Sequence, residues 1–108
     1  MNTAEATAPV FAALGDTTRL ALLHRLSDNE SLSISELSDG ASQTRQGVSK
    51  HLRVLEDAGL VISERVGRES RFRFAPDRVN EARDYLAEVS RHWDDALQRL
   101  RMFVEEKS

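Results

Sequence analysis

Residues 44–61 read TRQGVSKHLRVLEDAGLV, and this stretch decides the fold. Its apolar residues recur four and three positions apart, which places them on one face of a helix. Those residues are Val48, Leu52 and Leu55. Thr44 has a hydroxyl that can accept a hydrogen bond from the first turn, and Gly59 suits the left-handed residue that follows a helix. The pattern predicts a helix over residues 44–58, with Leu60 folding back onto its last turn.

A shorter helix is predicted just before this one, over residues 34–38. Ser33 and Glu36 match a capping box, in which each side chain accepts a hydrogen bond from the amide of the other residue. Residues 39–43 contain Gly40 and are expected to form a turn. A short helix, a tight turn and a longer helix together make a helix-turn-helix.

A β-hairpin is expected directly after the long helix. Residues 61–66 are β-prone, and the run Gly67-Arg68-Glu69 supplies a turn. Residues 71–74 then alternate polar and apolar, as a strand with one buried face does. A hairpin in this position forms the wing of a winged helix-turn-helix.

Three further helices are predicted, over residues 4–14, 17–26 and 77–106. Gly15 ends the first of them, and the Asp16 carboxylate can cap the second. The second helix is expected to bury Leu20, Leu23 and Leu26, and a polar loop follows it over residues 27–32. The predicted fold class is therefore mainly α with a two-stranded β wing. It forms one winged-helix domain over residues 1–108, with residues 1–14 and 77–106 as the dimerisation helices.

The last helix carries an apolar seam with heptad spacing of four and three residues. Its members are Ala82, Leu86, Val89, Trp93, Ala96, Leu100 and Phe103. We expect this seam and the apolar face of the first helix to form a homodimer interface. The alternative is that the seam only covers the core of its own chain. The predicted interface residues are Val10, Phe11, Leu14, Leu86, Val89, Trp93, Ala96, Leu100 and Phe103.

Charge is distributed unevenly along the 108 residues, although the chain as a whole carries a net charge of −3. Residues 43–73 hold 7 basic and 4 acidic side chains, whereas residues 1–42 hold 2 basic and 6 acidic ones. A basic segment in an acidic protein is typical of a nucleic-acid-binding face, because the remainder repels DNA. Chance asymmetry in a short chain is the alternative.

The start of the 44–58 helix carries the side chains that suit base recognition. Arg45 could pair with guanine and Gln46 with adenine in the major groove. Thr44 could contact a base or serve only as the N-cap, and the two roles can coexist. Gly47 allows either a close approach of the helix to DNA or simple tolerance near a helix end. Lys50 and Arg53 suit phosphate contacts, or a solvated helix face, and Arg68 at the hairpin tip suits a phosphate or the minor groove. The full set of predicted DNA-binding residues is Gln43, Thr44, Arg45, Gln46, Ser49, Lys50, His51, Arg53, Arg68 and Arg71.

Residues 44–61 resemble the recognition-helix signature of the ArsR/SmtB family of winged-helix repressors. Asp16-Thr17-Thr18-Arg19 resembles the opening of that family's second helix, where the second position is usually proline, and Gly67-Arg68-Glu69 followed by Phe72 resembles its wing. The resemblance implies that His51 lies near the DNA backbone; a hydrogen bond within the fold is the alternative. Trp93 in a long last helix resembles a branch of the family whose members generally lack the known metal ligands.

The chain contains no cysteine, which excludes disulfides and thiolate metal sites. In the last helix, Glu88, His92 and Asp95 share a face, but the family's full ligand set is absent, so we expect neither a metal nor another cofactor. Small-molecule and protein effectors both stay open. No apolar run is long enough for a membrane span and no segment resembles a secretion signal, so a cytoplasmic location is expected.

The predicted function is that of a transcriptional repressor that binds double-stranded DNA at an inverted-repeat operator as a homodimer. In this prediction, the 44–58 helix enters the major groove and residues 65–73 contact phosphate or the minor groove. The alternative is a winged-helix module that binds protein and no DNA. No Gly-rich phosphate loop or convincing Ser/His/Asp set suggests an enzyme.

Overall fold

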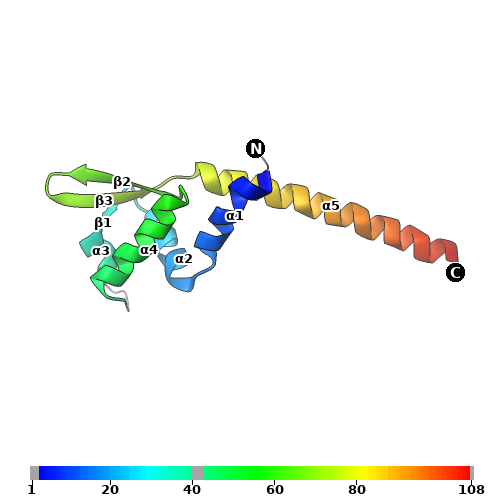
Figure 1. Ribbon diagram of the computed structural model, residues 1–108, viewed down its shortest axis with the longest axis horizontal. Coiled ribbons are helices and arrows are strands. Elements are labelled where there is room, and N and C mark those ends of the chain that lie inside the picture. The colour runs from blue at the N-terminus through cyan, green and yellow to red at the C-terminus, as the bar shows by residue number, and fades with distance from the viewer. Residues whose placement is uncertain (1–2, 40–42, 108) are drawn as a thin grey trace.

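The computed structural model describes residues 3–39 and 43–107, and the side chains of residues 4–39 and 43–106. Helices and strands follow one another as α1 (Thr3–Leu14), α2 (Thr17–Ser27), β1 (Leu32–Ser33), α3 (Ile34–Ser38), α4 (Arg45–Asp57), β2 (Val61–Val66), β3 (Glu69–Phe74) and α5 (Asp77–Lys107). The first four helices and the sheet form a body, and α5 projects from one end of it (Figure 1). The tip of the β2–β3 hairpin lies at the opposite end of the long axis. The predicted order of a short helix, a longer helix and a hairpin is confirmed, whereas residues 40–42 of the predicted turn lie outside the described residues.

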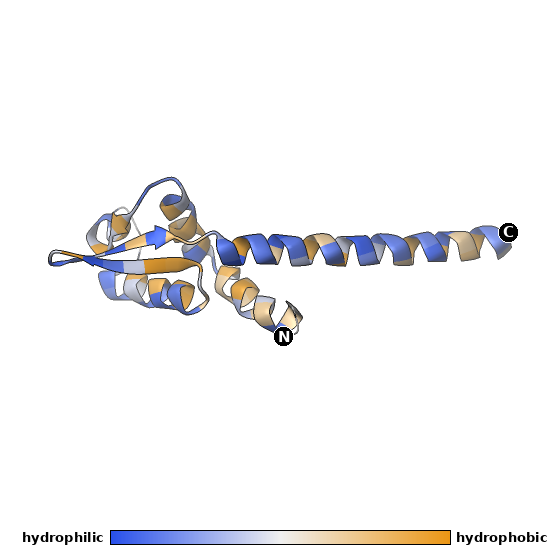
Figure 2. Cartoon of the chain, turned by 90° about the horizontal axis from the view of Figure 1, so that it is seen from above, coloured by the Kyte–Doolittle hydropathy of each residue, from blue (hydrophilic) through white to orange (hydrophobic). Residues whose placement is uncertain are grey.

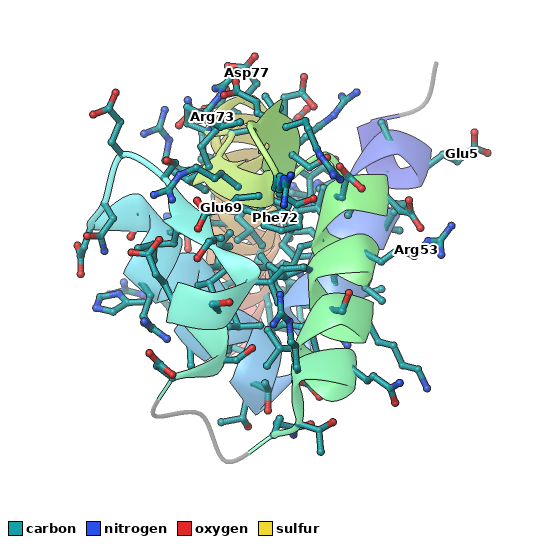
Figure 3. All side chains as sticks on the ribbon, turned by 90° about the vertical axis from the view of Figure 1, so that its left-hand side faces the viewer. Glu5, Arg53, Glu69, Phe72, Arg73 and Asp77 are labelled. Carbon is teal, nitrogen blue, oxygen red and sulfur yellow. The ribbon has the colours of Figure 1, made fainter. Side chains whose placement is uncertain are left out.

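The core is built around the apolar face of α4. Val48, Leu52 and Leu55 are fully buried, as their spacing predicts. They pack with Leu26 of α2 and Leu37 of α3. The sheet contributes through Phe72, which points toward the interior (Figure 3). The helix-turn-helix is therefore held by the same hydrophobic cluster that anchors the hairpin.

The ends of α4 are formed as the sequence predicts. The Thr44 hydroxyl accepts a hydrogen bond from the Gly47 amide at 3.1 Å, which satisfies one of the free donors of the first turn. Gly59 has a φ of 77°, and the Leu60 amide donates to the Leu55 carbonyl at 2.9 Å. A side chain at position 59 would be strained by this φ and would also meet Arg78 at 3.0 Å. Glycine is thus required where α4 turns into the wing.

Two other predicted caps are also confirmed. Asp16 caps α2 by accepting a hydrogen bond from the Arg19 amide at 3.0 Å. At α3, Ser33 and Glu36 form both hydrogen bonds of the capping box. These caps fix the starts of the two helices that precede α4.

The sheet has one strand more than predicted. Its order is β1-β3-β2, with Leu32 opposite Phe72 and Ser33 opposite Arg71. The predicted two-stranded wing is confirmed as the β2–β3 hairpin, whereas Leu32, predicted to end a polar loop, pairs with β3 as part of the short strand β1. A two-residue strand is too short to show alternation. Its residues pair because the chain passes beside β3 just before α3.

The buried face of α2 also differs from the prediction. Leu20 was expected in the core but is 49% exposed, whereas Leu22 is buried beside Leu23 and Leu26. The apolar residues of this helix occupy a wider arc than one stripe, so their spacing alone did not select the buried set. Leu20 instead lines a shallow apolar hollow with Leu14 of α1.

Helix α5 is mostly outside the body. Within the described residues, its first turns pack against the body: Ala82 is in the core, and the rings of Phe11 and Tyr85 lie 6.3 Å apart. The remainder extends alone and gives the chain dimensions of 70 × 30 × 21 Å (Figure 1). Polar and apolar residues alternate along it (Figure 2). None of the described helices is both long and apolar enough to span a membrane.

Candidate nucleic-acid interface

The first turn of α4 presents its polar side chains to solvent. Thr44, Arg45, Gln46 and Ser49 are all exposed, and Gly47 between them is half-buried. The inward-facing residues of this helix, beginning with Val48, fix which side faces out. All four predicted base-contacting residues therefore lie on the accessible part of the helix-turn-helix.

Five basic side chains on α4 and the wing are not neutralised within the described part of the fold. Among the residues that the structure describes, none of the following forms an ion pair or a side-chain hydrogen bond: Arg45, Lys50, Arg53, Arg65 and Arg68. Arg53 points away from the core on the outer side of α4 (Figure 3). Their guanidinium and ammonium groups remain available to a polyanion.

The start of α4 and the tip of the wing meet at one polar cavity. Arg45 and Arg68 both line this space of about 160 Å³, together with Ser35 of α3 and Ser70 of β3. Two cations from segments more than twenty residues apart thus share one opening. The sequence pattern singled out both arginines but gave no sign that they come together.

The hairpin turn exposes Arg68 in a defined way. Val66 pairs with Glu69, which leaves Gly67 and Arg68 as a two-residue loop. Gly67 has a φ of 62° at the first loop position, which matches the glycine that a type II′ hairpin turn requires. No other described atom lies within 4 Å of a Cβ built there. Arg68 therefore sits at an open tip, as predicted.

Arg71, unlike Arg68, is engaged with side chains of its own chain. Its Nε donates to Ser31 Oγ at 2.9 Å, and its Nη1 lies 3.2 Å from Glu36 and 3.1 Å from Glu69. The side chain is only 25% exposed. Its guanidinium ties β3 to the loop before β1 and to α3. Alternation along the strand predicted its face but not these partners, the nearest of which outside the hairpin is 35 residues away.

Glu36 is at the centre of this connection. Hydrogen bonds from the backbone and hydroxyl of Ser33 lower the pKa of the Glu36 carboxyl below its usual range, and the Arg71 guanidinium adds to this. The carboxylate therefore links the cap of α3 to the wing strand.

His51 is also turned toward its own chain. Its side chain is 19% exposed, with Nδ1 at 3.3 Å from Nη1 of Arg19 and 4.0 Å from the Asp16 carboxylate. The hydrogen bond from the Arg19 amide, with the nearby charges of Arg19 and His51, lowers the pKa of Asp16. The structure thus places His51 in contact with Arg19 and Asp16 near the start of α2, as the alternative of a hydrogen bond within the fold expected. The quoted run Asp16-Thr17-Thr18-Arg19 was the signal for these contacts.

Gln43 precedes the N-cap of α4 and contacts α2. Its Nε2 donates to the Thr18 hydroxyl at 3.3 Å. The side chain is exposed, so this hydrogen bond leaves it accessible. The start of α2 thus contacts α4 at two points, through Gln43 and His51.

The predicted dimer residues divide into two groups. Val10 is 2% exposed and belongs to the core of its own chain, while Phe11 and Leu14 are half-buried. On α5, by contrast, Trp93 is 63% exposed, and Val89 and Ala96 are half-buried. Large exposed apolar residues cluster on the outer half of this helix, including three that the seam did not contain. The large exposed residues of α5 are Leu86, Trp93, Leu97, Leu100, Met102, Phe103 and Val104.

Histidine and carboxylate side chains do not gather into a metal-like cluster in residues 3–39 and 43–107. His24 of α2 lies 3.5 Å from Asp28, the residue that follows the helix, and both side chains are exposed. The expectation that no metal is held stays a prediction.

Known proteins are similar to this chain over the segment that contains the helix-turn-helix. Residues 14–64 match the family model described as a helix-turn-helix domain. An uncharacterized HTH-type transcriptional regulator of Bacillus subtilis, YuzN, is 48% identical over 65 residues, covering 55% of this chain and 71% of that protein. The arsenical resistance operon repressor of Escherichia coli is 30% identical over 67 residues, covering 62% of this chain and 57% of that one.

A solved structure extends the match to the long helix. The ArsR-like transcriptional regulator from Rhodococcus sp. RHA1 has a TM-score of 0.85 and 35% identity, covering 95% of this chain and 96% of that one. Fold and exposed basic face together define a helix-turn-helix DNA-binding protein. The chain belongs to the ArsR family of winged-helix transcriptional regulators, which are not enzymes.

Proposed function

We propose that this protein is a transcriptional repressor that binds an inverted-repeat DNA operator as a homodimer. The observation that carries the proposal is the unpaired set of five basic side chains on α4 and the wing, Arg45, Lys50, Arg53, Arg65 and Arg68. Cations that find no acidic partner in the described part of their own chain are suited to phosphate oxygens. Arg25 of α2 and Arg73 of β3, by contrast, are engaged within the fold.

Base recognition is assigned to the exposed start of α4. In this arrangement, Arg45 and Gln46 read base edges in the major groove, and Ser49 supports them from the next turn. Lys50 and Arg53 contact phosphates on the outer side of the same helix. Arg68 contacts a phosphate or the minor groove from the wing tip. Arg71 and His51 contribute by holding the wing and α4 in place, because their polar groups already have partners in the fold.

The homodimer is inferred from the outer half of α5. Trp93, Leu97 and Leu100 are each more than half exposed in the single chain. Apolar residues spread over a helix surface in this way mark an interaction surface. A two-fold dimer also supplies the second recognition helix that specific binding at an inverted repeat needs. By its name, the E. coli relative is a repressor, which supports the same direction of regulation here.

Selection of bound DNA from a random duplex pool tests the proposal. The expected result is an inverted repeat whose half-sites lie about one helical turn, roughly 34 Å, apart. Enrichment of a single unrepeated site would contradict the dimer. Absence of any enrichment would contradict DNA recognition and favour a module that binds protein. A transcription assay with the recovered site then distinguishes repression from activation.

A further inference from the structure

We propose that Arg19 is a positioning residue, which holds the recognition helix α4 at a fixed orientation to α1 and thereby sets the half-site spacing that the dimer accepts. The inference rests on the proposed function, because half-site spacing has a meaning only for a dimer that binds DNA. Arg19 itself lies on the first turn of α2 and is not among the residues assigned to contact DNA.

The Arg19 guanidinium bridges α1 and α4. On the side of α1, Arg19 Nε donates to the Ala13 carbonyl at 2.6 Å and Nη2 donates to the Ala12 carbonyl at 3.4 Å. Carbonyls in the last turn of a helix have no partner within it, so the arginine acts as a C-terminal cap for α1. On the side of α4, Nη1 lies 3.3 Å from Nδ1 of His51. Arg19 therefore connects the recognition helix to α1, which in turn packs against α5, the helix of the proposed dimer interface.

Packing does not make this connection redundant. A groove of about 430 Å³ lies beside Arg19, lined on one side by Ala12 and Ala13 of α1 and on the other by Val54 and Asp57 of α4. Side chains that interdigitate across two helices fix their relative orientation. Val10 and Ala13 of α1 share the core cluster with α4, but at the surface the two helices are separated by this open groove, and Arg19 lines it.

The backbone of Arg19 is itself fixed. The Asp16 carboxylate accepts the hydrogen bond from the Arg19 amide at 3.0 Å and lies 4.0 Å from His51. The neighbouring Thr18 accepts the hydrogen bond from Gln43, which precedes the first residue of α4. The start of α2 thus holds α4 near its beginning and near its middle, and α1 at its end.

The change in DNA affinity when the half-site spacing is altered reports how rigidly Arg19 links α4 to α1. Each base pair inserted between half-sites rotates one of them by about 35° relative to the other, since a turn contains 10 to 10.5 base pairs. A dimer accommodates such a change only if its recognition helices can swing relative to the dimer helices. A rigid link therefore gives a narrow preference for one spacing.

The experiment compares wild type with Arg19→Gln and Arg19→Lys. The probes are duplexes carrying the inverted repeat recovered by selection, the same repeat with one or two base pairs added or removed, and a duplex with a single half-site. Arg25→Gln is the matched control. Arg25 is on the same helix and also caps a neighbour, donating to the Leu37 and Glu36 carbonyls of α3. Thermal unfolding followed by circular dichroism shows whether each variant is folded.

The expected result is a loss of spacing preference in the Arg19 variants alone. Wild type and Arg25→Gln should lose about tenfold or more in affinity per base pair of changed spacing, and the Arg19 variants less than about threefold. Affinity for the single half-site should stay within about twofold of wild type. Arg19→Lys keeps the charge and provides the test if Arg19→Gln does not fold.

Two outcomes overturn the inference while leaving the proposed function intact. In one, folded Arg19 variants keep the spacing penalty of wild type. In the other, the Arg19 variants lose affinity for the single half-site by the same factor as for the whole inverted repeat. That result would assign Arg19 to DNA contact or to general stability. If wild type itself recovers no inverted repeat, the proposed function fails and the inference fails with it.

Discussion

Nη1 of Arg71 lies 3.2 Å from Oε1 of Glu36, so the returning strand of the wing is joined to the first helix of the helix-turn-helix. The same guanidinium donates to the carbonyl and hydroxyl of Ser31. Arg68, three residues earlier, makes no such contact with any described residue. Two arginines of one wing therefore have separate roles.

Arg68→Ala and Arg71→Ala should give opposite patterns of change. For Arg68→Ala, we expect weaker binding to all DNA sequences and a slope of log affinity against log salt that is reduced by about 1, because one phosphate contact is lost. For Arg71→Ala, we expect a lower melting temperature and an unchanged salt slope. Titrations at several salt concentrations, with thermal unfolding, check both. An unchanged melting temperature for Arg71→Ala would contradict its structural role.

Arg45→Ala should weaken binding to the specific duplex more than binding to random duplexes. Loss of a bidentate contact to guanine is expected to cost about 1–3 kcal/mol on the specific duplex and to relax preference at one base position. Random duplexes should be bound almost as well as by wild type. Lys50→Ala, a phosphate-contact change on the same helix, is the control and should weaken both equally. An equal loss on both duplexes for Arg45→Ala would remove its base-reading role.

Acid should destabilise the protein in part through Glu36. Its folded-state pKa is lowered mainly by the hydrogen bond from the Ser33 backbone, so its contribution is complete above the unfolded pKa of about 4.3 and is lost as pH falls through the folded-state pKa. Glu36→Gln keeps an acceptor for the Ser33 amide but does not titrate, since glutamine also completes a capping box. Urea unfolding at pH 7 and pH 3 should therefore show a smaller acid loss in Glu36→Gln than in wild type. Glu88→Gln on the exposed part of α5 is the control. If both variants lose as much unfolding free energy between pH 7 and pH 3 as wild type does, the contribution assigned to Glu36 is contradicted.

Leu100→Glu should dissociate the proposed dimer without unfolding the body. Leu100 is 58% exposed in the single chain, so its own fold does not depend on it. A charge placed there would lose its hydration on association and find no partner. Sedimentation at micromolar concentration should show a monomer for Leu100→Glu. Gln98→Glu adds the same charge to a different face of the helix and should remain dimeric; a dimer in both cases would place the interface elsewhere.

Excess arsenite or Zn²⁺ should leave the DNA affinity unchanged. The chain has no cysteine, and the described residues hold no group of three or more histidine or carboxylate side chains that could bind a metal. The measurement is a titration of the recovered operator with and without each ion, with EDTA as the matching metal-removal arm. Release of DNA by either ion, reversed by EDTA in the case of Zn²⁺, would contradict the assignment to a metal-independent branch.

Local patterns predicted the recognition helix and its caps well, because the forces there act within a few residues. The spacing of Val48, Leu52 and Leu55 places them on one face of the helix, and that face is buried. Gly59 is required by a backbone angle at its own position. The same locality explains why Thr44 could be identified as an N-cap.

Contacts between distant segments could not be predicted in this way. Ser31 and Arg71 are 40 residues apart, and Arg19 and His51 are 32 apart, so no periodicity connects them. Leu20 was placed in the core because its spacing fitted one stripe, but the direction of that stripe depends on how α2 sits against β3 and α4. The two-residue strand β1 likewise exists only because β3 lies beside it.

The 31-residue helix α5 has a consequence for how the chain reaches its native state. Most of its large apolar side chains are exposed in the described part of the single chain, and helices in proteins gain most of their stability from packing of an apolar face rather than from intrinsic propensity. Order in the outer half therefore depends on whatever covers its apolar side chains. If that cover is a second copy, folding and association become one equilibrium, and the fraction of fully helical chains rises with the abundance of the protein.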